Sequence, residues 1–150
     1  MSKKINIQFF IKDISTLEFS VKNPPDKTFK IPKDVVFQVT PSSSIDLPSS
    51  TVDFITFIGI YLDKEKTKNI CELVTSIKFG IKDLTKFIDE KDKNLLHLPD
   101  QFMQTLLSIS LSTNRGILAA KTEGTALNNV YLPVLNPTQF EPTDKIVETT

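Results

Sequence analysis

The chain has 150 residues, a formal net charge of zero from 18 basic and 18 acidic residues, and 39% hydrophobic residues. This length suits one domain with its own core, and the composition excludes wholesale disorder. The zero net charge argues against a nucleic-acid-binding protein, which needs surplus cation to displace counterions from phosphate. The 11 Phe residues and the absence of Trp indicate aromatic surface that is buried or presented to an apolar ligand.

The first part of the chain predicts two strands. A period of two defines the apolar face of the first strand, which comprises Ile5, Ile7, Phe9 and Ile11. A short second strand is expected over residues 35–39, between two prolines. The Ser- and Pro-rich residues 41–50 are expected to form a loop.

Two further strands are predicted on either side of a polar link over residues 63–69. The strand over residues 52–62 is apolar on both faces, and its second face carries Ile55, Phe57 and Tyr61. The strand over residues 70–81 alternates and points one set of side chains to a single side: Cys71, Leu73, Thr75, Ile77, Phe79 and Ile81. Short or proline-marked links make an antiparallel meander the simplest arrangement.

A single long helix is predicted after Pro99, because apolar residues recur at spacings of three and four over residues 102–111. Asn114-Arg115-Gly116 is expected to end it. The predicted fold class is therefore α+β, with a four-stranded antiparallel meander and one long helix packed on it. Residues 1–140 are expected to form one domain, and residues 141–150 a polar, disordered tail.

The residues that usually carry catalysis are scarce. His97 is the only histidine and Cys71 the only cysteine, which excludes multi-histidine metal sites, disulfides within the chain and cysteine-based metal sites. We expect His97 to have a structural or surface role and Cys71 to be a buried, inert thiol. No nucleophile elbow, P-loop or dinucleotide fingerprint occurs, so neither an enzyme nor a cofactor is expected. No secretory signal or membrane-spanning run is evident, and a cytoplasmic protein is expected.

Several short fragments resemble motifs of the SecB family of bacterial export chaperones, and they occur in the same order over roughly residues 5–140. They are Lys12-Asp13-Ile14-Ser15, Ile70-Cys71-Glu72-Leu73, Asn94-Leu95-Leu96-His97-Leu98-Pro99, Arg115-Gly116 and Leu132-Pro133-Val134. The second, C-terminal helix of the family has no clear counterpart here. That helix helps to wall the family's peptide groove, so a shallower or differently built groove is expected.

The resemblance implies partners and an assembly. A surface that docks a SecA-type translocation ATPase would comprise Asp13, Glu18, Ile70 and Glu72. A dimer of dimers is implied, with first strands paired edge to edge and long helices between the sheets. The implied oligomer interface comprises Ile5, Ile7, Phe9, Cys71, Leu73, Phe102, Leu106 and Ile109.

The predicted function is that of an ATP-independent holdase that binds unfolded or precursor polypeptides for export, without nucleic acid or membrane insertion. The apolar residues proposed to contact clients are Phe10, Phe19, Phe29, Ile55, Phe57 and Tyr61. Burial at a subunit interface is the competing explanation for each of them. The alternatives are a SecB-like chaperone dedicated to one partner, such as an antitoxin, a module that binds a small apolar ligand, and a purely structural oligomer.

Overall fold

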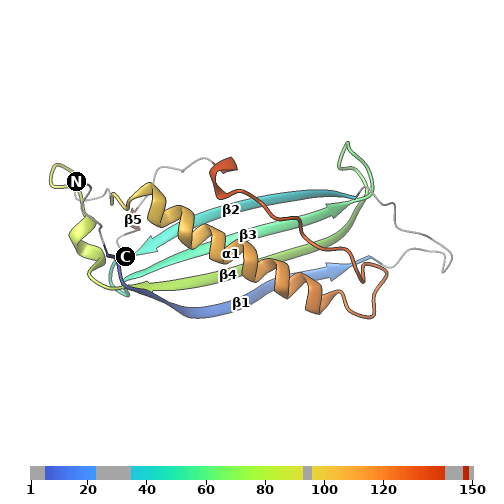
Figure 1. Cartoon of the computed structure of the whole chain (residues 1–150), viewed down its shortest axis with the longest axis horizontal. Helices are drawn as coiled ribbons and strands as arrows, with labels where there is room; N and C mark the ends of the chain where they lie inside the picture. The colour runs from blue at the N-terminus through green and yellow to red at the C-terminus, as the bar shows by residue number, and fades with distance from the viewer. Residues whose placement is uncertain (1–5, 23–34, 93–95, 141–146, 149–150) are drawn as a thin grey trace.

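The computed structural model describes residues 6–22, 35–92, 96–140 and 147–148. Four long strands form a sheet, and one long helix lies across one face of it (Figure 1). The main elements are β1 (Phe9–Val21), β2 (Val36–Asp46), β3 (Thr51–Tyr61), β4 (Asn69–Ile81) and α1 (Asp100–Lys121). Three short elements accompany them: η1 (Leu84–Phe87), η2 (Pro137–Gln139) and β5 (Val147–Glu148).

The strand order β1-β4-β3-β2-β5 confirms the four-stranded antiparallel sheet and the α+β class. The predicted meander holds only for β2, β3 and β4, because β1 lies beside β4 and not beside β2. This position gives β4 a hydrogen-bonded neighbour on each edge. Strand β5 pairs in parallel with the end of β2. The division at residue 140 stays a prediction.

The core lies between α1 and the sheet. The predicted inward face of β4 is confirmed, since its six members from Cys71 to Ile81 are all buried. One apolar cluster surrounds Leu106 and Leu111 in the first half of α1, and a second surrounds Leu118 near its end. Between the clusters lie four fully buried polar side chains: Thr56, Thr75, Ser110 and Asn114.

Strand β2 is longer than predicted. Residues 41–46, which we expected in a loop, continue the strand opposite β3 as far as Asp46. The Ser- and Pro-rich composition is compatible with a strand here because β2 is almost entirely an edge strand, and Pro is tolerated where no ladder bond is needed. The predicted loop over residues 41–50 is therefore reduced to a turn at residues 47–50.

Helix α1 also runs beyond its predicted end, through Gly116 to Lys121. Leu118 is fully buried and anchors this last stretch in the second cluster. Burial of such a side chain contributes about 1.5–3 kcal/mol, which outweighs the roughly 1 kcal/mol cost of a helical glycine. The chain then turns back, and the Arg115 guanidinium donates hydrogen bonds to the carbonyl oxygens of Leu132 and Pro133 at 2.9 and 3.1 Å.

Candidate polypeptide-binding site

A groove of about 430 Å³ lies between β2, the start of α1 and η2; we call it the β2 groove. Its apolar walls are formed by side chains from distant parts of the sequence, among them Val39, Phe54, Met103, Leu107 and Phe140. Local structure holds each wall: the Met103 amide donates to the Pro99 carbonyl at 3.0 Å, and the Asn136 side chain caps η2. Asp100 is the one charged residue among the described residues that line the groove.

The resemblance implied a shallower or differently built groove, but none of the predicted client residues that the structure describes lines the β2 groove. Its β2 wall spans residues 39–43, most of which were assigned to a loop. Its far wall consists of η2 and Phe140, in the region where the sequence has no clear counterpart of the family's second helix. The sequence does contain two relevant features. One is the proline within the edge strand, and the other is the segment Pro137-Thr138-Gln139-Phe140, where the chain comes back after α1. Neither feature shows by itself that the two lie together.

The face of the sheet opposite α1, here the open face, carries most of the predicted client residues. Ile55 (36% exposed), half-buried Phe57 and buried Tyr61 follow one another along β3. A Cβ atom at Gly59 would lie 2.8 Å from the Tyr61 ring and 3.1 Å from the Phe57 ring, so both rings lie against the glycine backbone. The Tyr61 hydroxyl donates to the Gln38 side chain at 3.3 Å.

Phe10 lies on the same face but on β1, where its side chain is 61% exposed. Its ring covers Gly80, at which a Cβ atom would approach within 2.4 Å. Phe19 was grouped with these residues, and the structure corrects that grouping. Phe19 lies on the α1 side, packs on the second cluster and has Lys121 Nζ 5.4 Å from its ring centroid. Phe29 lies outside the described residues.

The residues predicted to dock a motor protein are only partly brought together. Glu18 pairs with Val74 and Ser20 with Glu72, so the two carboxylates are diagonal neighbours on the open face. Asp13 pairs with Lys78, six residues further along β4 and thus roughly 20 Å from Glu72. Ile70 is half-buried and packs on the second cluster.

The residues predicted for the oligomer interface are divided between the core and its margin. Cys71, Leu73 and Leu106 are at most 1% exposed and belong to the core of this chain, so their prediction as interface residues is wrong. Helix α1 of the same chain covers this face of β4, as the predicted packing of the helix on the sheet implies. The half-buried members lie at the margin of the first cluster: Ile7, Phe9, Phe102 and Ile109. Ile5 lies outside the described residues.

A strip of exposed apolar side chains lies along β1, the outer strand of the sheet. Ile11 is 45%, Ile14 46% and Leu17 56% exposed. Two bulges, after Ile11 and after Thr16, interrupt the pairing of β1 with β4. An edge strand with exposed apolar residues favours association with another chain.

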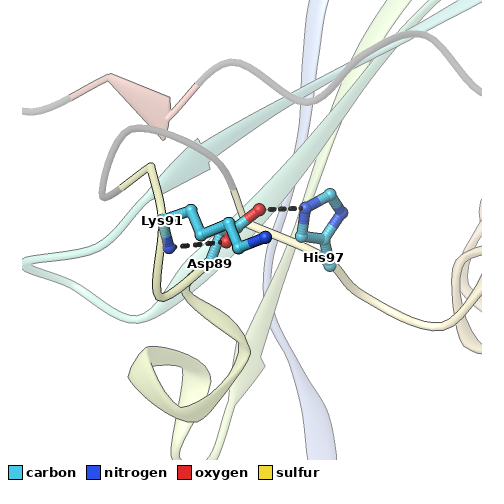
Figure 2. Close-up of polar contacts among 3 residues, drawn as sticks. All are labelled: Asp89, Lys91 and His97. Carbon is cyan, nitrogen blue, oxygen red and sulfur yellow. Dashed lines mark hydrogen bonds and ion pairs between the residues drawn. The ribbon is translucent and has the colours of Figure 1, made fainter.

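The surroundings of His97 and Cys71 indicate structural roles for both side chains. His97 Nε2 lies 2.9 Å from Asp89 Oδ2, and the Lys91 amide donates to Asp89 Oδ1 at 2.8 Å (Figure 2). These contacts lower the pKa of Asp89, the Lys91 amide first and the His97 hydrogen bond second. Burial raises the pKa of the Cys71 thiol to about 11, which disfavours the reactive thiolate.

The part of the chain that the structure describes has neither a metal-binding cluster of side chains nor a membrane-spanning helix. No group of three or more His, Cys, Asp or Glu side chains there is arranged to hold a metal ion. Among the same residues, no helix has the length and hydropathy to cross a membrane.

No protein-family model and no curated protein matches the sequence. A solved structure does match: the Mycobacterium tuberculosis Rv1957 SecB-like chaperone in complex with a ChAD peptide from the Rv1956 HigA1 antitoxin. The TM-score is 0.55 at 13% sequence identity, over 85% of this chain and 87% of that chain. At this identity the likeness concerns the arrangement of the sheet and helix, and it shows that this chain has a divergent SecB-like fold.

Proposed function

We propose that this protein is an ATP-independent holdase that binds non-native polypeptides. The observation that carries the proposal is the β2 groove, an apolar groove beside the edge of a strand. Met103 gives one wall a flexible, polarizable side chain that adapts to differently shaped partners, as binding without sequence selection requires. The fold match to a chaperone that was solved with a bound peptide supports the proposal.

The test is suppression of aggregation of an unfolded client at near-stoichiometric ratio. Met103→Asp places a charge in the groove wall and is expected to abolish suppression. Gln101→Asp adds the same charge to the same helix turn, outside the residues that line the groove, and is expected to retain it. Circular dichroism shows whether both variants are folded. Equal suppression by both folded variants refutes the groove, and no suppression by the unaltered protein refutes the holdase.

The proposal extends to delivery of clients to a SecA-type translocation ATPase in the cytoplasm. The adjacent carboxylates of Glu18 and Glu72 on the open face support it, beside the apolar Ile55 and Phe57. The double variant Glu18→Gln, Glu72→Gln is expected to weaken binding of the ATPase at low ionic strength and to leave aggregation suppression unchanged. Asp13→Gln, at the far end of the face, is the control. Unchanged ATPase binding in the double variant contradicts this docking site.

A second candidate is a chaperone dedicated to one partner. The observation that favours it is the antitoxin peptide held by the structurally similar chaperone. Affinity purification from native cells separates the two functions. One stoichiometric partner indicates dedication, whereas a broad set of precursor proteins indicates general export.

We also propose assembly into a dimer of dimers. The exposed strip of Ile11, Ile14 and Leu17 on the edge strand supports it. Light scattering of the purified protein measures the mass of the assembly. Leu17 and Lys12 are the extra residues of the two bulges in β1. Leu17→Asp is expected to lower the mass of the assembly, while Lys12→Asp is expected to leave it unchanged. A monomeric mass for the unaltered protein refutes the assembly.

A further inference from the structure

The outer edge of β2 is largely unpaired. Strand β3 covers the inner edge over the whole length of β2, but β5 covers the outer edge only at Ile45 and Asp46. Along residues 36–44 no described strand pairs with the outer edge. Its backbone groups are therefore a template for another extended segment.

Pro41 shows which backbone groups face outward. Because Pro41 has no N–H, its position opposite Thr56 in the ladder is one whose backbone groups point away from β3. Alternate residues share this orientation, so Phe37, Val39, Ser43 and Ile45 offer both N–H and C=O at the outer edge, and Pro41 offers C=O alone.

Three of these residues line the β2 groove, together with Thr40 and Ser42 between them. Val39, Pro41 and Ser43 line it, and Met103 and Leu107 form the wall across it. A strand added at the outer edge would lie about 4.8 Å from β2. Every second side chain of that strand would then point into the groove, because side chains alternate between the two faces.

We infer that client segments add to the outer edge of β2 as a parallel strand, seating alternate side chains in the β2 groove. This inference rests on the proposed function. The direction comes from β5, whose parallel pairing shows that this edge accepts a chain of that polarity. A client that pairs along β2 as far as Ile45 needs the backbone groups that β5 uses, so β5 is an internal competitor.

The lining of the groove defines the chemistry of the segment. Phe54, Met103 and Leu107 favour apolar side chains at every second position, and Asp100 favours a nearby lysine or arginine. Pro41 removes one donor from the middle of the edge, which limits the number of backbone bonds. Binding is therefore expected to be weak enough for rapid exchange, as a holdase requires.

The test uses a short fluorescein-labelled peptide of alternating valine and threonine with one lysine, and fluorescence anisotropy of the full-length protein. N-methylation of one alternate set of peptide nitrogens is expected to weaken binding by roughly tenfold or more, and N-methylation of the other set to leave it nearly unchanged. A spin label at the peptide N-terminus is expected to broaden the amide resonance of Val36 and not that of Asp46. A chain that stops before Val147 is expected to bind roughly threefold to tenfold more tightly, while a chain that stops after Glu148 is the control.

The outcomes separate this inference from the proposed function. Three results overturn parallel strand addition in competition with β5. They are equal effects of N-methylation in the two sets of peptide nitrogens, broadening of the Asp46 amide resonance, and unchanged peptide affinity after removal of β5. Retained aggregation suppression in any of these cases leaves the holdase in place. A protein that suppresses aggregation without binding the peptide also overturns strand addition, and one that does neither overturns both.

Discussion

Thr56 and Thr75 provide a matched pair for measuring what the buried polar side chains under α1 contribute. They face each other across β3 and β4, and both are fully buried. The Thr75 hydroxyl lies 2.5 Å from Asn114 Oδ1 and donates to it, whereas Thr56 Oγ1 has no hydrogen-bond partner. Replacement by valine, which has nearly the same shape, is therefore expected to have opposite effects at the two positions.

The magnitudes follow from what each change leaves behind. In Thr75→Val, Asn114 loses its remaining bond, since its Nδ2 is already unpaired, and the free energy of unfolding is expected to fall by about 1–3 kcal/mol. In Thr56→Val, an unpaired hydroxyl no longer has to be buried, and the free energy of unfolding is expected to rise by about 1 kcal/mol. Ser110→Ala removes another unpaired buried hydroxyl and is expected to act in the same direction as Thr56→Val.

Urea unfolding followed by far-ultraviolet circular dichroism measures the difference. All variants are compared at one protein concentration, because the stability of an oligomer depends on concentration. The slope of the free energy against urea is expected to stay constant, so that shifts in the midpoint report stability. Destabilisation by Thr56→Val as large as that by Thr75→Val refutes the reasoning, because it requires a bonded hydroxyl at both positions.

Three further predictions concern packing, reactivity and titration. Gly59→Ala is expected to lower the free energy of unfolding by about 1–3 kcal/mol, because the buried ring of Tyr61 covers the glycine. Gly80→Ala is expected to lower it by less than about 1 kcal/mol, because the exposed ring of Phe10 can turn away. Equal losses of stability in urea unfolding contradict this prediction. Iodoacetamide is expected to spare Cys71 in the native protein at neutral pH and to alkylate it in urea, as mass spectrometry detects, whereas rapid native labelling refutes its burial. The pKa of Asp89 is held below its ordinary 3.8, so its contribution to stability is complete above that pH and is lost as the pH falls through the lowered value. Carboxyl NMR titration is expected to show that His97→Gln raises this pKa only part of the way, since a backbone N–H is the larger cause, and an unchanged pKa argues against the pair.

The sequence predicted the elements whose burial alternates or recurs regularly. Strand β4 was predicted correctly to within one residue because its period of two is uninterrupted and one whole face is buried under α1. The start of α1 was predicted for similar reasons. The end of α1 was not, because local glycine chemistry at Gly116 is outweighed by the burial of Leu118, a contact with strands far away in the sequence.

The candidate site was harder to predict because its walls meet only in the folded chain. Val39 from β2, Met103 from α1 and Phe140 after η2 come from three separate segments, and nothing in their local patterns indicates that they share a groove. The polar composition of β2 reflects its position near the edge of the sheet, where most of its outer backbone groups are not hydrogen-bonded to a described strand. The feature that made residues 41–46 resemble a loop is therefore the feature that leaves this strand available to another chain.

The position of Asp13 on the open face depends on irregularities that a strict period of two does not predict. In an uninterrupted strand, Asp13 would share the face of Phe9 and Ile11, toward α1, and Ile14 would face the other way. The bulge after Ile11 exchanges them, so that Asp13 joins Phe10 on the open face, and the bulge after Thr16 restores the original alternation. The bulges thus keep the apolar side chain of Ile14 on the α1 side and place a carboxylate on the open face. The bulges therefore decide the face of Asp13 but not that of Glu18, which an uninterrupted strand would also place on the open face. The groove, in contrast, does depend on a departure from regular pairing, because the incomplete pairing of β2 leaves its outer edge available.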